Sequence, residues 1–177
     1  MNVWEEFQER YPAARAPWTG EKPLREAFPG ATDELVAVLA TLGTGALGLD
    51  AHRLFNLDEA KARHASALAQ LARERDEVVE FDAAQCSGQG HDSAQDCLDA
   101  LAGLRPVVAG LYPLMGPDDV YDFVYVVLGG EWHGRVGNWY HDYPVCELFE
   151  DPPEHVDLAA FGAQLLEIAA DSGASLL

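Results

Sequence analysis

The stretch from Val120 to Leu128 constrains the fold most, because it is an almost unbroken run of β-branched and aromatic residues. Such a run is typical of a central strand that is covered on both faces. Its one charged residue, Asp122, must then lie near a strand end or find a polar partner. Glycine and proline breaks separate three further strand-like segments, which predict an antiparallel meander around this strand: Val107–Tyr112, Arg135–Tyr140 and Val145–Phe149. A turn is predicted at residues 116–119.

Helix signals surround the predicted strands. Thr32 is a suitable N-cap for a helix that runs to Leu42, and Asn56 with Glu59 three residues later has the capping-box pattern at the start of a long helix. Apolar residues at helical spacing predict further helices at residues 3–11, 94–104 and from residue 157 onward, whereas residues 12–30 are expected to be irregular. The sequence therefore predicts an α+β fold with a central, mostly antiparallel sheet flanked by helices, in a single domain over residues 1–177.

The chain is strongly acidic, and its charge is unevenly distributed. It has 177 residues and a formal net charge of −19, and from residue 106 onward one basic residue, Arg135, stands against twelve acidic ones. Direct nucleic-acid binding is disfavoured because it needs clustered lysine and arginine. The N-terminal sequence has no leader pattern and no stretch is apolar enough for a membrane span, which predicts a cytoplasmic protein. A strongly negative surface favours a basic protein as partner.

Acidic and aromatic residues alternate around the last two predicted strands. Trp132 lies between glycines in a predicted loop, where an exposed ring could anchor a partner. Carboxylates nearby would form a negative rim around it. The predicted partner-binding residues are Glu131, Trp132, Asp142, Glu147, Glu150 and Asp151. A solvated acidic face without a partner has the same composition, so this alternative stays open.

The three cysteines allow a test for a metal site. Cys86, His91 and Cys97 follow one another at spacings of five and six residues, and Cys146 would have to be a distant fourth ligand. Structural zinc sites usually have closer cysteine pairs, so neither a metal nor another cofactor is predicted. An odd number of cysteines without an export signal favours thiols over disulfides.

No catalytic motif is present, so no catalytic residue is assigned and a non-enzymatic protein is predicted. The glycines form neither a phosphate-binding loop nor a dinucleotide-binding pattern, and no nucleophile motif occurs. The alternative is a small metal-dependent or hydrolytic enzyme that uses His133, His141, Asp142 and Cys146 near the tryptophan loop.

Three segments of the chain resemble the SUKH superfamily, the Smi/Knr-type domain. They are Asp33–Leu42 followed by Gly-Thr-Gly, the segment Arg53-Leu-Phe-Asn-Leu-Asp-Glu-Ala60, and Gly134-Arg-Val-Gly-Asn-Trp-Tyr-His-Asp142, with a comparable terminal helix over residues 157–171. The chain departs from the family pattern at Phe28-Pro29 and in a longer, helical or loop insertion at about residues 61–105.

The resemblance implies an α+β binding module with no catalytic residues. In polymorphic toxin systems such proteins are immunity proteins that neutralise a cognate toxin, often a nuclease. A basic toxin domain is therefore the expected partner of this acidic chain. A regulatory scaffold that binds an endogenous protein remains the other expectation for a non-enzymatic protein.

Overall fold

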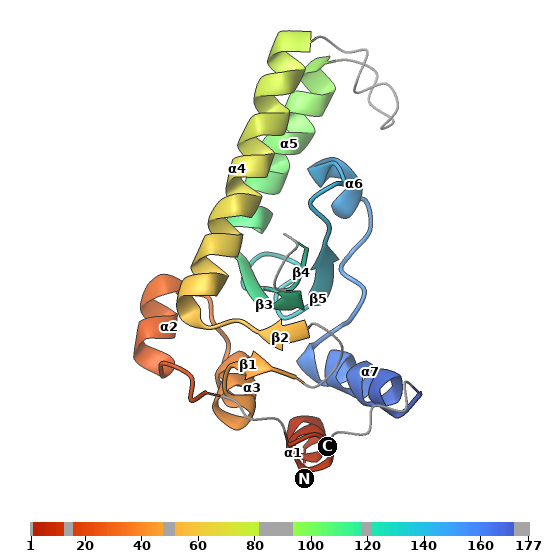
Figure 1. Cartoon of the computed structure of the whole chain (residues 1–177). Helices are drawn as coiled ribbons and strands as arrows, with labels where there is room; N and C mark the ends of the chain where they lie inside the picture. Colours follow the sequence, from red (N-terminus) through yellow and green to blue (C-terminus); the bar gives the residue numbers. More distant parts are fainter. Residues whose placement is uncertain (1, 13–15, 48–51, 82–93, 118–121, 172–177) are drawn as a thin grey trace.

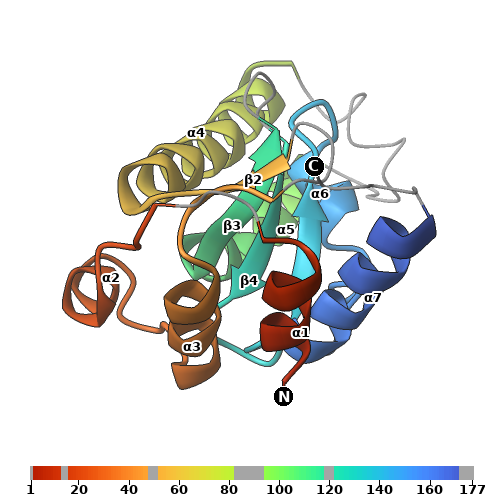
Figure 2. The ribbon, with the colours of Figure 1, turned by 60° about the horizontal axis from the view of Figure 1, so that its bottom comes forward.

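The computed structural model describes residues 2–12, 16–47, 52–81, 94–117 and 122–171, and it has helices on both faces of one sheet (Figures 1 and 2). Among these residues no helix is both long enough and apolar enough to cross a lipid bilayer. The elements in chain order are α1 (Val3–Arg10), α2 (Glu21–Ala27), α3 (Asp33–Leu42), β1 (Gly45–Ala46), β2 (His52–Leu54), α4 (Leu57–Phe81), α5 (Ala94–Ala109), β3 (Leu111–Pro117), β4 (Phe123–Val127), β5 (Val136–Trp139), α6 (Val145–Leu148) and α7 (Leu158–Asp171).

The sheet is an antiparallel meander in the order β1-β2-β3-β4-β5, which confirms the predicted fold class. Strand β4 is an interior strand between β3 and β5, next to the central strand β3, and its residues from Tyr125 to Val127 are buried, as the apolar run predicts. On one face Phe123 pairs with Trp139, whose ring contacts Gln70 of α4 and Phe149 at the end of α6. On the other face Val124 pairs with Asn138 and lies beside α7. The sheet therefore has two buried faces with different helical cover.

Each outer strand has one additional backbone pairing on its outer side. Thr44, directly before β1, exchanges backbone hydrogen bonds of 2.8 and 2.9 Å with Ala16. Val136 in β5 exchanges two backbone hydrogen bonds of 3.0 Å with His155. Both contacts are antiparallel bridges that continue the sheet by a single residue.

The predicted helix starts are confirmed by their capping contacts. The Thr32 hydroxyl accepts the backbone N–H of Leu35 at 3.0 Å, which satisfies a donor at the start of α3. Asn56 accepts the backbone N–H of Glu59 at 3.0 Å and donates its own backbone N–H to the Glu59 carboxylate at 2.8 Å. This reciprocal capping box fixes the first turn of α4.

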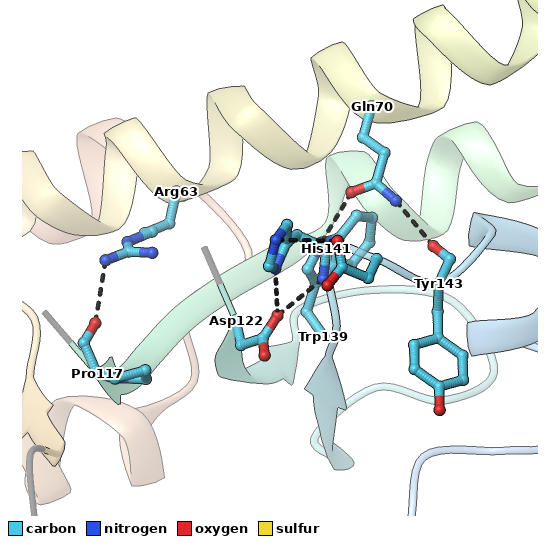
Figure 3. Close-up of polar contacts among 8 residues, drawn as sticks. Arg63, Gln70, Pro117, Asp122, Trp139, His141 and Tyr143 are labelled. Carbon is cyan, nitrogen blue, oxygen red and sulfur yellow. Dashed lines mark hydrogen bonds and ion pairs between the residues drawn. The ribbon is translucent and has the colours of Figure 1, made fainter. Parts of the chain in front are cut away.

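Helices α4 and α5 form an antiparallel pair that extends beyond the sheet (Figure 1). They contain the described part of the insertion predicted at about residues 61–105. Residues 77–81 form the C-terminal end of α4. His64 Nε2 lies 3.1 Å from the carbonyl oxygen of Val108, which joins the two helices. Arg63 Nη2 donates to the carbonyl oxygen of Pro117 at 3.1 Å and thereby ties α4 to the end of β3 (Figure 3).

The predicted strand at Val145–Phe149 is wrong, because these residues form α6 and its C-cap. Val145 and Phe149 are both buried, and their spacing of four residues suits one helical face as well as it suits a strand. Pro144 precedes the helix with a φ of −56°, and its carbonyl oxygen accepts the backbone N–H groups of Glu147 and Leu148. Tertiary contacts thus select the helical alternative.

Three other predicted boundaries also differ from the structure. Val107–Tyr112 was expected to be a strand, but α5 continues to Ala109 and β3 begins at Leu111, after Gly110 donates its N–H to Pro106. Gly116 and Pro117 end β3 instead of starting a turn, and residues 118–121 lie outside the described residues. The segment 12–30, expected to be irregular, contains helix α2, which buries Leu24.

Candidate functional site

A hollow of about 620 Å³ lies between the C-terminal half of α4, helix α5 and the segment that joins β5 to α6. Its charged lining residues are three carboxylates, Glu74, Glu77 and Asp142, and one guanidinium, Arg73. Its complete lining is Gln70, Arg73, Glu74, Glu77, Val78, Cys97, Leu101, His141, Asp142, Tyr143, Pro144 and Cys146. The hollow is therefore lined by both polar and apolar groups, and its three carboxylates outnumber its one guanidinium.

Gln70 is the centre of the polar contacts behind this hollow (Figure 3). Its side-chain oxygen accepts the indole N–H of Trp139 at 3.2 Å. Its amide nitrogen donates to the carbonyl oxygen of Tyr143 at 2.9 Å and to Glu74 Oε1 at 3.1 Å. Gln70 and Trp139 are only 7% and 1% exposed, so these hydrogen bonds are shielded from water. The amide group fixes α4 against β5 and the segment that follows it.

Glu74 positions the start of α6. Its Oε2 accepts the backbone N–H of Val145 at 2.8 Å, a group that the preceding helix residues cannot satisfy. Burial raises the pKa of the Glu74 carboxyl, and the hydrogen bonds from Val145 and Gln70 oppose this rise. The short helix α6 is thus held by a carboxylate from a different element.

The raised pKa of Glu74 predicts that the stability of the fold depends on pH. Because its pKa in the folded protein lies above the ordinary value of 4.5, the folded state binds this proton more tightly than the unfolded chain does. Its stabilising contribution is fully present below the unfolded pKa and is lost as the pH rises through the raised folded pKa. The Glu74→Gln variant should therefore lose less unfolding free energy than the wild type between about pH 4 and pH 7. Urea unfolding at a series of pH values measures this difference, and equal slopes would contradict the prediction.

His141 lies between two carboxylates at the edge of the hollow (Figure 3). Asp122 Oδ1 accepts the backbone N–H of His141 at 2.8 Å and lies 2.8 Å from its Nδ1, while Asp142 Oδ1 lies 3.1 Å from its Nε2. Asp122 thus finds the polar partner that its place in an apolar run requires, directly before β4. A neutral imidazole donates to only one of these carboxylates at a time, whereas imidazolium donates to both.

Three of the four residues named for the alternative, an enzyme active site, line the hollow. His141, Asp142 and Cys146 line it, but His133 does not. Cys97 lines it as well, and both Cys97 and Cys146 carry thiols, as predicted, while Cys86 and His91 lie outside the described residues. Within the described ranges no group of three or more histidine, cysteine and carboxylate side chains has the arrangement of a metal site.

The predicted partner-binding residues fall into two classes. The five carboxylates are exposed, and they will be called the acidic face: Glu131, Asp142, Glu147, Glu150 and Asp151. Trp132 was expected to be exposed, and this is wrong. It is half-buried, packs against the core and stacks on Phe149 with a centroid distance of 6.1 Å and an interplanar angle of 10°. The ring is covered because α6 presents Phe149 to it, a contact that the sequence did not show.

Trp132→Ala is therefore expected to affect folding. Removing a half-buried ring should lower the free energy of unfolding by about 1–3 kcal/mol, because the stacking contact and part of the apolar burial are lost. Tyr143→Ala is the matched control, since the Tyr143 side chain is exposed and its ring points away from α4 (Figure 3). It should change stability by less than about 0.5 kcal/mol. Urea unfolding compares the two, and equal effects would contradict the stacking assignment.

No protein-family model, no curated protein and no solved structure matches this chain. The site is therefore interpreted from its own geometry.

Sequence reasoning missed Gln70 and Glu74, although a signal was present. Both lie on α4, four residues apart, beside the apolar positions Ala67, Leu71 and Val78 that the sheet and α5 bury. Two polar residues at this spacing share one helical face next to the buried stripe. Such a pair indicates a buried polar contact, but only the fold identifies Trp139 and Val145 as its partners.

Proposed function

We propose that this protein is a non-enzymatic binding module whose acidic face docks on a basic protein. One observation carries the proposal: residues 136–171, which contain β5, α6 and α7, include no lysine and no arginine. The five carboxylates of the acidic face lie on or beside α6 and are exposed. Complementary charge of this kind accelerates encounter with a basic partner and disfavours acidic ones.

The acidic face is supported by a fixed framework. Helix α6 is anchored at its start by the hydrogen bond from Val145 to Glu74 and at its end by the buried ring of Phe149. Phe149 stacks on Trp132, and two of the carboxylates are direct chain neighbours of these rings: Glu131 precedes Trp132 and Glu150 follows Phe149. Exposed charges on a rigid support lose little conformational freedom on binding, which favours recognition.

The partner class follows from the resemblance to the SUKH superfamily, which makes a basic toxin domain, such as a nuclease, the proposed partner. The antiparallel sheet with helices on both faces agrees with the fold that this resemblance implies. The other possible basic partner is an endogenous protein, in which case this chain would be a regulatory scaffold. The experiment below distinguishes a toxin from an endogenous partner.

A small hydrolase or metal-dependent enzyme is the second candidate function. It is favoured by one observation, the placement of His141, Asp142 and Cys146 around a single hollow. Cys146→Ser and His141→Asn would abolish such an activity while leaving binding through α6 largely intact. Elemental analysis of the purified protein tests the metal-dependent form, and a stoichiometric transition metal would support it.

The decisive experiment uses a basic toxin encoded next to the gene for this chain. The purified protein should form a complex with the toxin, and its co-expression should restore growth to cells that produce the toxin. Cys146→Ser should protect as well as the wild type. Complex formation without protection would favour a regulatory partner, protection that needs Cys146 would favour the enzyme, and absence of any basic partner would overturn the proposal.

A further inference from the structure

We propose that the hollow between α4, α5 and the β5–α6 segment is the receptor for an arginine side chain of the partner. This inference rests on the proposed function and deepens it, because it assigns a specific anchor in addition to the acidic face. Three features of the hollow carry it: a fixed carboxylate that neutral donors hold, apolar walls, and an excess of negative charge at the rim.

The fixed carboxylate is Glu74. Its two oxygens accept hydrogen bonds from Gln70 Nε2 at 3.1 Å and from the backbone N–H of Val145 at 2.8 Å, and both donors are neutral. A carboxylate has about four lone-pair sites, so two remain for a ligand. Burial already disfavours the charged form of this group. A cation in the hollow would offset that penalty, and the two held oxygens would face it in a fixed geometry.

The walls and the rim favour a guanidinium. Val78 and Leu101 are 8% and 3% exposed and line the hollow, where they can cover the methylene stem of a long basic side chain. Glu77, Asp142 and Arg73 are exposed and also line the hollow, and Arg73 Nε lies 3.8 Å from Glu77 Oε1. Arginine suits a partly desolvated carboxylate better than lysine does, because its planar fork is weakly hydrated and donates several hydrogen bonds.

A free volume of about 620 Å³ accommodates such a side chain, since ligand sites in proteins generally have about 300–1,000 Å³. The hollow is therefore large enough for a single long side chain of the partner, which is the occupant we propose. The acidic face would then guide the partner, and the hollow would fix its orientation.

The structure also supplies a reporter for occupancy. Glu74 is joined through Gln70 to the indole N–H of Trp139, so a cation at Glu74 should shift the indole signal of Trp139 in a proton–nitrogen NMR spectrum. The probe is N-acetyl-L-arginine methylamide, and the matched neutral probe is the corresponding citrulline compound, which has the same shape without the charge. Trp4, on α1, provides an internal reference signal in the same spectrum.

The test uses two exposed positions on α4 with effects of opposite sign. Glu77→Gln removes a negative charge and should weaken binding of the arginine probe by about two- to fivefold. Arg73→Gln removes the competing guanidinium and should strengthen it by about two- to fivefold. Both side chains are largely exposed, with 49% and 65% accessibility, so both variants keep the fold. Titration of the Trp139 signal measures the affinities.

Several outcomes would overturn the inference: no saturable shift of Trp139 with the arginine probe, an equal shift with the citrulline probe, or changes of the same sign in the two variants. A lysine probe that binds more tightly than the arginine probe would overturn the preference for guanidinium. If these tests fail while the toxin complex still depends on Glu147 and Glu150, which do not line the hollow, the proposed function stands without the receptor. If they succeed and no basic protein partner exists, the receptor stands without the proposed function.

Discussion

Replacing Gln70 by leucine is expected to lower the free energy of unfolding by about 2–4 kcal/mol, because a buried donor and a carbonyl oxygen lose their partner at once. The indole N–H of Trp139, 1% exposed, would lose its acceptor, and the carbonyl oxygen of Tyr143 would lose its donor. Leucine has a similar volume, so the effect reports the hydrogen bonds more than a cavity. For a domain of this size the melting temperature should fall by roughly 2–4 °C per kcal/mol.

Gln95→Leu is the matched control for Gln70→Leu. Gln95 also donates its amide to a carboxylate four residues away, Asp99, at 2.8 Å, but this pair is exposed on α5. The same chemical change there should alter stability by less than about 0.5 kcal/mol. Urea unfolding of both variants makes the comparison. If Gln70→Leu is as stable as the control, the buried amide is not a structural centre of the site.

The largest expected effect on binding comes from reversing two charges of the acidic face. Glu147→Lys/Glu150→Lys should slow association with a basic partner by about 10- to 100-fold at low salt, since electrostatic steering changes rates by about 10–10³-fold. The difference should shrink as salt is raised, because exposed charges are screened over about 8 Å at physiological ionic strength. Stopped-flow measurements at several salt concentrations give the rates.

A control variant with identical net charge distinguishes the effect of charges on the acidic face from the effect of the total charge of the molecule on the association rate. Glu9→Lys/Glu26→Lys replaces exposed carboxylates on α1 and α2, and both double variants carry a formal −15 in place of −19. The control should slow association much less than the acidic-face variant does. Equal slowing would show that the partner responds to the total charge of the molecule and would remove the docking assignment.

Local signals in the sequence predicted the parts of the fold that local interactions determine. The N-caps at Thr32 and Asn56 act within three residues, and both helix starts were correct. The strand predicted from the apolar run was correct because a strand covered on both faces is recognisable from its own continuous apolar sequence. Asp122 was correctly expected to need a partner, but the partner His141 comes from a distant segment.

The errors lie where two local patterns are compatible with the same residues. Val145 and Phe149 are four apart, and only the contacts to Glu74 and Trp132 select a helix over a strand. Trp132 was expected to be exposed because glycines flank it, yet the ring of Phe149 covers one face. The hollow could not be predicted, since its lining comes from α4, α5 and the β5–α6 segment, which are far apart in the chain.

The single-residue bridges at Ala16–Thr44 and Val136–His155 have a consequence for how a partner can be recognised. A sheet edge with a long row of unpaired backbone groups invites another chain to add a strand, and such β-augmentation depends little on side-chain identity. Here β1 and β5 have two and four residues, and each bridge occupies backbone groups on the outer side. A partner of the proposed kind would therefore be recognised through side chains, and its specificity could change by surface substitution while the sheet remains the same.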